Sequence, residues 1–270
     1  MEIPLFPLHT VLCPGIVVPL HIFEERYRAL TRHCLETGAP FGIVLIRDGQ
    51  SVGSGRRGGK ASTLALAGVG ALVEIREADR FPDGRYQLLA AATGRFAIDS
   101  VDLSRAPYLV ADVTPLDDEV GDEVRAERLA APAIRRFVRY LELMRIREGE
   151  TGDALDIRVE LDSVVVSEVE DDDQADEPEP VMDADDERPS SSEPASASLA
   201  IPDDPTVLSY LLSGIVQVEL PRRQRLLEAA TTVERLEELV ALLDREVLLL
   251  SRRLRLFAPE ARTMDGPRRS

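Results

Sequence analysis

The chain has 270 residues, of which 44% are hydrophobic, and a formal net charge of −17. This length and apolar content suffice for a sizeable hydrophobic core, which excludes a chain that is disordered throughout. Thirteen acidic residues and one arginine fall between residues 168 and 193, so this segment alone carries −12. The remaining −5 gives the rest of the chain no general attraction for nucleic acid or anionic lipid.

Cysteine content and the N-terminal sequence indicate a cytoplasmic protein with no membrane partner. The two cysteines, Cys13 and Cys34, are too few for a disulfide framework. The apolar N-terminus has Glu2 where a secretory signal has a basic residue. Prolines also interrupt each apolar run before it reaches the roughly 18–20 residues that cross a bilayer.

Residues 1–116 carry the pattern of many strands and one helix, which predicts a small, partly closed β-barrel rather than a parallel α/β sheet. In residues 1–23 short apolar stretches alternate with prolines, as in edge strands and turns. A helix is predicted over residues 24–37, and Gly38 is placed to end it. The other predicted strands cover residues 41–48, 63–80, 84–98 and 107–116, with a hairpin turn at Asp83–Gly84.

Residues 117–150 and 201–258 are predicted to form an α-helical bundle, with Pro132 kinking or interrupting the first helix. Between these parts, the acidic, Pro- and Ser-rich residues 167–200 predict a disordered insert, and residues 259–270 a flexible tail. Three helix starts in the second part are marked by Asp204–Pro205, by Pro221 and by Thr231 with Glu234.

The last predicted helix has an apolar residue at alternating intervals of three and four. One interpretation is a coiled-coil seam that joins two copies of the chain through residues 231–257. The favoured interpretation is a core stripe that packs on the helix at 122–147, because the neighbouring helices need an apolar partner. The stripe comprises Val233, Leu236, Val240, Leu243, Val247, Leu250, Leu254 and Phe257, and the facing residues are Ile134, Phe137, Leu141 and Met144.

Residues 53–62, GSGRRGGKAS, imitate two nucleotide-binding loops and contain the only lysine, Lys60. The G-x-G-x-x-G pattern needs a following helix for the pyrophosphate, but a strand pattern follows. The phosphate-binding loop G-x-x-x-x-G-K-[ST] lacks its first glycine, and Ala61 replaces the hydroxyl that binds Mg²⁺. We therefore predict a hairpin loop and no nucleotide cofactor.

No catalytic or metal-binding residue is predicted either. A Ser–Lys pair needs a buried, neutral lysine, whereas Lys60 lies among glycines and arginines and is expected to be solvated and charged. The three histidines and two cysteines lack the close spacing of structural zinc sites.

The most specific stretch of the sequence is IPLFPLHTVLCPGIVVPLHIFEERYRALTRHCLETGAPFGIVLIRDG near the N-terminus. It resembles the N-terminal substrate-binding domain of the Lon ATP-dependent protease family, with the elements P-L-F-P-L, P-G, P-L and F-E-x-R-Y in order. The residues that carry this resemblance, expected to be mainly structural but also candidates for a peptide-binding surface, are Pro4, Phe6, Pro7, Pro14, Gly15, Pro19, Phe23, Glu24, Arg26 and Tyr27.

The resemblance implies an α+β fold in which a PUA-like, partly closed β-barrel precedes an α-helical bundle. It also implies a non-catalytic module that binds exposed or unfolded polypeptide segments, as an adaptor to a separate protease or chaperone. Neither the ATPase module nor the Ser–Lys peptidase domain of Lon has a counterpart here, so a free-standing member is expected. The alternatives are a PUA-like nucleic-acid-binding module, disfavoured by weak charge and few aromatic residues, and a peptidase or ATPase, for which no site is found.

Overall fold

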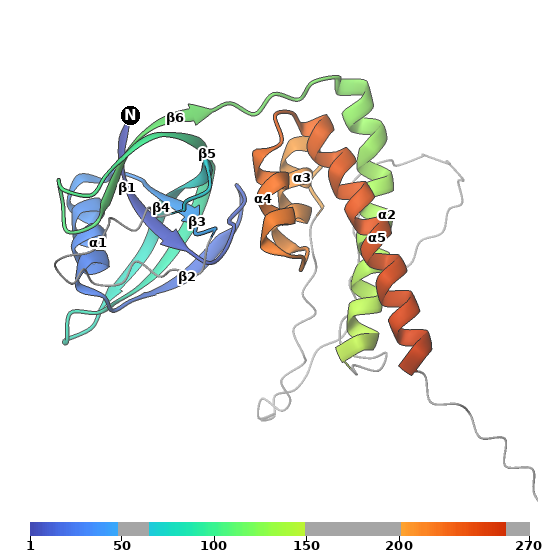
Figure 1. The fold of residues 1–270 in the computed structure, drawn as a ribbon, viewed down its shortest axis with the longest axis horizontal. Helices are drawn as coiled ribbons and strands as arrows, with labels where there is room; N and C mark the ends of the chain where they lie inside the picture. The colour runs from blue at the N-terminus through green and yellow to red at the C-terminus, as the bar shows by residue number, and fades with distance from the viewer. Residues whose placement is uncertain (48–64, 149–200, 258–270) are drawn as a thin grey trace, which may run out of the picture.

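The computed structural model describes residues 1–47, 65–148 and 201–257. It contains a strand-rich unit and a helical unit, which are joined by the segment that follows the last strand (Figure 1). The strand-rich unit consists of β1 (Glu2–Leu8), β2 (Val17–Ile22), α1 (Glu25–Thr37), β3 (Phe41–Leu45), β4 (Val69–Arg80), β5 (Tyr86–Asp102) and β6 (Leu109–Leu116). The helical unit consists of α2 (Glu123–Glu148), α3 (Pro205–Ile215), α4 (Leu220–Glu228) and α5 (Thr232–Phe257).

Several predictions concern segments outside the described residues and stay predictions. These are the hairpin loop at 53–62, the acidic insert at 167–200 and the tail at 259–270. Among the helices that the structure describes, none is long and apolar enough to cross a membrane.

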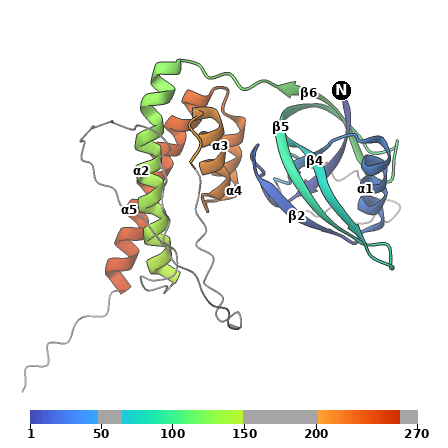
Figure 2. The same ribbon diagram turned by 180° about the vertical axis from the view of Figure 1, so that it is seen from behind.

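The strands form the predicted partly closed barrel. Their order is β2-β5-β4-β3-β1-β6, and β5 also pairs with β6. The 17-residue β5 pairs with β2 along its first half and with β6 along its second half, so that five strands close into a ring and β2 remains at its edge. The pairing of β1 with β3 is parallel and the others are antiparallel. Seen from behind, α1 lies on the side of the barrel away from the helical unit (Figure 2).

The prediction that the N-terminal strands are both edge strands is wrong for β1. This strand pairs with β6 through residues 2–5 and with β3 through residues 5–8. Met1 exchanges hydrogen bonds with Val113 of β6, so by alternation Pro4 faces away from β6. The Leu8 carbonyl accepts the Ile46 N–H, so Pro7 faces away from β3. The missing N–H groups therefore remove no ladder hydrogen bond, and an interior strand tolerates both prolines.

A large aromatic side chain fills the barrel where two strands carry glycine. Phe96 of β5 is fully buried, and a Cβ atom added at Gly42 or Gly70 would lie 2.5 Å or 2.6 Å from its Cζ atom. The two glycines thus make room for the ring, and close packing of this kind leaves no space for an added methyl group.

The helices begin and end where local signals predicted. Gly38 adopts the left-handed conformation, with φ 68°, and ends α1. Asp204 caps α3 by accepting the Thr206 N–H at 2.7 Å. The Thr231 hydroxyl accepts the Glu234 N–H at 3.1 Å at the start of α5. The three capping predictions for these helices are confirmed.

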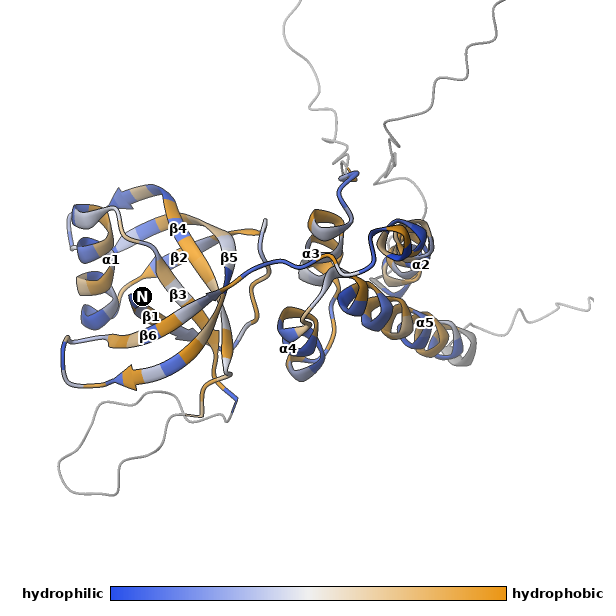
Figure 3. Ribbon diagram, turned by 90° about the horizontal axis from the view of Figure 1, so that it is seen from above, coloured by the Kyte–Doolittle hydropathy of each residue, from blue (hydrophilic) through white to orange (hydrophobic). Residues whose placement is uncertain are grey.

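The apolar stripe of α5 packs on α2, as the favoured interpretation predicted. Phe137, Leu243 and Leu250 belong to one buried cluster shared by the two helices, and α2 lies beside α5 in the view from above (Figure 3). No break occurs at Pro132, because α2 is one helix from Glu123 to Glu148. Buried residues on both sides of Pro132 join the same core, and their packing outweighs the roughly 3 kcal/mol that an interior proline costs.

The strand-rich and helical units meet at a buried arginine. Arg95 of β5 is 3% exposed and donates hydrogen bonds to the carbonyl oxygens of Leu227 and Ala229 at 2.9 and 2.8 Å. It also forms an ion pair with Asp118 at 2.9 Å. Because a buried guanidinium needs these acceptors, the contact fixes the barrel against the α4–α5 corner.

Candidate functional site

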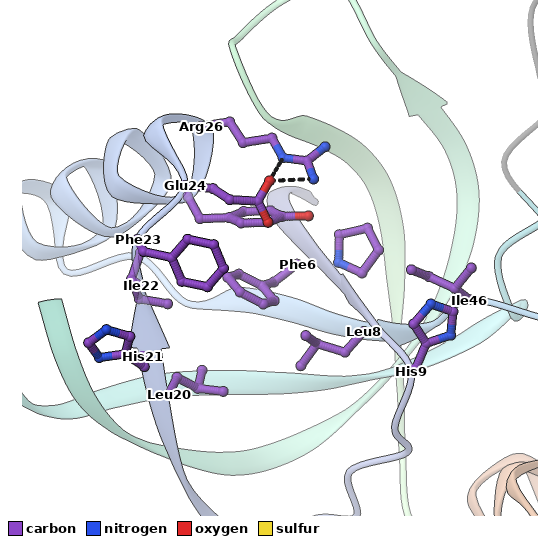
Figure 4. A pocket seen from close by; sticks show the side chains of 12 residues that line it. Phe6, Leu8, His9, Leu20, His21, Ile22, Phe23, Glu24, Arg26 and Ile46 are labelled. Atoms are coloured by element: carbon purple, nitrogen blue, oxygen red, sulfur yellow. Dashed lines mark hydrogen bonds and ion pairs between the residues drawn. The ribbon is translucent and has the colours of Figure 1, made fainter. Parts of the chain in front are cut away.

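A pocket of about 310 Å³ opens between β1 and β2 on the strand-rich unit (Figure 4). Its floor is formed by buried side chains from both strands and from the first turn of α1, among them Phe6, Leu20, Ile22 and Tyr27. The Phe6 and Tyr27 rings lie with their centroids 4.1 Å apart. This floor offers an apolar surface to whatever enters the pocket.

The β1 side of the pocket is an unpaired strand edge. The Leu8 carbonyl accepts the Ile46 N–H at 2.9 Å, so the backbone of Leu8 faces towards β3. Backbone groups alternate along a strand, and the preceding residue, Pro7, therefore faces the pocket. A proline at this position presents a carbonyl oxygen to the pocket but no N–H.

The β2 side repeats this arrangement. The Ile16 carbonyl accepts the Ala92 N–H at 3.0 Å, so by alternation the backbone of Pro19 faces away from β5 and towards the free edge of β2. Among the strand pairings of the described residues, none joins β1 to β2. A proline on each edge removes one N–H donor from each strand, which disfavours a regular ladder along this seam between β1 and β2.

The rim of the pocket combines an exposed aromatic side chain with a neutralised ion pair. Phe23 is 63% exposed. Next to it, Glu24 and Arg26 form an ion pair at 2.8 Å, and the Arg26 guanidinium lies 4.5 Å from the centre of the Tyr27 ring. Figure 4 shows this pair above the aromatic side chains. The rim thus favours an uncharged, apolar ligand.

Burial raises the pKa of the Tyr27 phenol above its ordinary value, while Arg26 acts in the opposite direction. The phenol is therefore protonated at neutral pH and adds no charge to the pocket. The chemistry that this arrangement supports is non-covalent contact with apolar groups, with the seam carbonyls as hydrogen-bond acceptors.

The structure brings together six of the ten residues singled out in the sequence. Phe6, Pro7, Phe23, Glu24, Arg26 and Tyr27 line the pocket.

The other four residues lie outside the pocket lining. Pro4 and Pro19 lie in strands, and Pro14 and Gly15 occupy the centre of a turn closed by the Ile16 N–H and the Cys13 carbonyl at 3.2 Å. Gly15 has φ 83°, as the third residue of a type II turn requires.

Sequence reasoning missed the remaining lining residues. Leu20 and Ile22 are two apart on β2 and share its inner face, so strict alternation was a usable signal for them. Ile46 follows β3 and reaches the pocket only because β3 pairs with β1. His9 and His21 lie at the rim (Figure 4), and no local pattern marked them.

The family comparison identifies the class of protein. Residues 2–245 match the model of the ATP-dependent protease La (LON) substrate-binding domain. The chain therefore belongs to this family. It is 25% identical over 268 residues to the Lon protease of Azorhizobium caulinodans, a match that covers 98% of this chain and 25% of that protein. The chain thus spans about a quarter of the length of this relative.

Two solved structures are similar in fold. One is the Lon N-terminal domain protein from Xanthomonas campestris, at 22% identity and TM-score 0.49, covering 89% of this chain and 98% of that one. The other is the N-terminal domain of Mycobacterium avium complex Lon protease, at 15% identity and TM-score 0.52, covering 90% and 98%. The second likeness concerns the fold alone.

Proposed function

We propose that this chain is a non-catalytic module that binds exposed apolar segments of unfolded or extended polypeptides in the seam pocket between β1 and β2. The observation that carries the proposal is the convergence of Phe6, Phe23, Tyr27 and three further motif residues on this one pocket. The family to which the chain belongs is described as substrate-binding, and the substrates of a protease are polypeptides. In this role the chain acts as an adaptor to a separate protease or chaperone.

The seam accounts for binding without strict sequence preference. An apolar side chain of the client enters the pocket, while a backbone N–H group of the client donates to the carbonyl oxygen of Pro7 at the pocket edge. Pro7 supplies an acceptor but no donor, so a client strand forms fewer hydrogen bonds than a full ladder would give. Because the client also loses conformational freedom, we expect micromolar affinity, about −8 kcal/mol.

Binding is expected to change little with salt. The charged groups at the rim, Glu24 and Arg26, already neutralise each other, and the attraction comes from apolar contact. A nucleic-acid ligand would behave differently, because its affinity falls steeply as salt concentration rises. Salt dependence therefore separates the proposed function from the nucleic-acid alternative.

The test is fluorescence anisotropy of a labelled, permanently unfolded polypeptide titrated with the full chain. We expect a Kd near one micromolar, and the variant Phe23→Ala should weaken binding about tenfold, because it removes the exposed aromatic wall. Leu35→Ala is the control, since Leu35 is 46% exposed on α1 and does not line the pocket. Binding weaker than about millimolar, or equal effects of the two variants, would contradict the proposal.

A further inference from the structure

The seam pocket has a neighbour with which it shares a wall. A second pocket of about 160 Å³ lies between α1 and the segment that joins β5 to β6. Arg26 and Tyr27 line both pockets, whereas Leu103 and Tyr108 line only the second. The two pockets are therefore separated by the width of these shared side chains.

Each pocket carries one unusually exposed apolar side chain. Among the large hydrophobic residues that the structure describes, Leu103 at 67% and Phe23 at 63% are the most exposed. Leu103 lines the second pocket and Phe23 the first. Two such side chains on either side of one wall extend the apolar surface of the pockets, and clustered exposure of this kind marks binding surfaces.

The segment that carries Leu103 is braced rather than loose. The Asp102 carboxylate accepts the Ser104 N–H and the Ser104 hydroxyl, each at 2.7 Å. Arg105 forms ion pairs with Asp102 and with Glu2 of β1. These contacts fix the residues on either side of Leu103 before a ligand arrives, which lowers the entropic cost of ordering this segment on binding.

We infer that the two pockets form one bipartite site, which takes two apolar side chains of the same extended polypeptide, spaced i and i+2. The inference rests on the proposed function, because it assigns the spacing of the side chains in that polypeptide ligand. In an extended chain the side chains at i and i+2 point to the same face, about 7 Å apart. Two pockets divided by a single wall of side chains are the arrangement that such a pair of side chains would occupy.

The charges around the site favour an uncharged segment as its occupant. Arg26 is paired with Glu24, and Arg105 is paired with Asp102 and Glu2, so neither side presents an unpaired ion to the ligand. A compact small molecule would fill one pocket, whereas a chain with alternating side chains reaches both. The occupant is therefore an extended, uncharged polypeptide with apolar residues at alternate positions.

Three labelled Gly/Ser peptides test the spacing against the full chain by fluorescence anisotropy. One has a single leucine, one has leucines at i and i+2, and one has leucines at i and i+1, which point to opposite faces. The i, i+2 peptide should bind about tenfold more tightly than either of the others, a gain of ~1.4 kcal/mol that corresponds to covering one more leucine. Equal affinities of the two double-leucine peptides would overturn the inference.

Two variants test whether the second pocket provides the higher affinity of the i, i+2 peptide. Leu103→Ala should remove the tenfold advantage of the i, i+2 peptide and leave the single-leucine peptide within about twofold, because that peptide uses the larger pocket. Leu35→Ala is the matched control, since Leu35 is 46% exposed on α1 and lines neither pocket. An advantage that survives Leu103→Ala would also overturn the inference. If the unfolded polypeptide still binds while the spacing preference is absent, only the bipartite site is rejected and the proposed function stands. If neither the peptides nor the unfolded polypeptide bind, the bipartite site and the proposed function are both rejected.

Discussion

Proline positions decide where this barrel closes and where it stays open. Pro4 faces away from β6, its only sheet neighbour at that point, so no ladder hydrogen bond is lost there. Pro7 faces the pocket and Pro19 faces the free edge of β2, so each of these strands lacks one N–H donor on the side where a ladder could join them. The same residue type is therefore neutral at Pro4, removes a donor from the free edge of β2 at Pro19, and lines the binding site at Pro7.

At the scale of single residues, burial also controls the two thiols. It raises the pKa of Cys13 and of Cys34 from 9.0 to about 11, with Arg223 the largest opposing influence at Cys13. Because the thiolate is the reactive form, we expect neither cysteine to react with an aromatic disulfide reagent at pH 8 while the protein is folded. In urea both should react within minutes. The measurement is the absorbance of released thiol with and without urea.

The same pKa shift has a consequence for stability. The folded thiols keep their protons up to about pH 11, whereas those of the unfolded chain ionise near pH 9. Their contribution to the free energy of unfolding is thus fully present below pH 9 and is lost as the pH rises towards 11. In the assay with the aromatic disulfide reagent, rapid labelling of the folded protein at pH 8 would contradict the burial of the two thiols.

At the scale of elements, the pairing of α2 with α5 stabilises the helical unit. The stripe on α5 faces α2, so its apolar residues differ sharply in exposure from their neighbours on the same helix. Leu243 is fully buried, whereas Leu249 is 44% exposed. This contrast allows two identical substitutions on one helix to be compared.

Leu243→Ala should lower the free energy of unfolding by about 2–5 kcal/mol, because it leaves a cavity between the helices. Leu249→Ala should change it by no more than about 0.5 kcal/mol. Urea denaturation followed by circular dichroism measures both. If residues 231–257 instead formed a dimer, the stripe would face a second copy of the chain. Leu243→Ala would then convert a dimer to a monomer on a sizing column without lowering the free energy of unfolding, and this result would contradict the packing on α2.

At the scale of the whole molecule, two arginines join the barrel to α4 in different environments. Arg95 is buried, donates hydrogen bonds to the carbonyl oxygens of Leu227 and Ala229, and forms an ion pair with Asp118. Arg47 is about half exposed and forms an ion pair with Glu228 at 3.0 Å. Both contacts link the two units, but solvent screens only the second.

Removal of Arg95 should therefore be far more costly than removal of Arg47. Arg95→Ala is expected to lower the free energy of unfolding by about 3–5 kcal/mol, because buried acceptors and the Asp118 carboxylate lose their donor. Arg47→Ala should cost no more than about 1 kcal/mol. Both values come from urea denaturation at equal protein concentration. A similar decrease in the free energy of unfolding in the two variants would contradict the role of Arg95 as the main contact between the barrel and α4.

Local patterns in the sequence were sufficient for most elements and for part of the site. The Asp83–Gly84 turn, the cap at Asp204 and the stripe of α5 were predicted, because turn, cap and periodicity signals act over a few residues. The N-terminal motif predicted the family and the partly closed barrel, and six of its ten highlighted residues line the pocket.

Tertiary structure alone decided which strands are neighbours. The parallel pairing of β1 with β3 placed β1 inside the sheet, and the shared pairing of β5 with β2 and β6 left the seam between β1 and β2. The seam pocket combines Phe6 of β1, Ile22 of β2 and Ile46, which follows β3. Leu103, from the segment between β5 and β6, lines the second pocket. Strand pairing depends on contacts between residues far apart in the chain, so no local signal carries it.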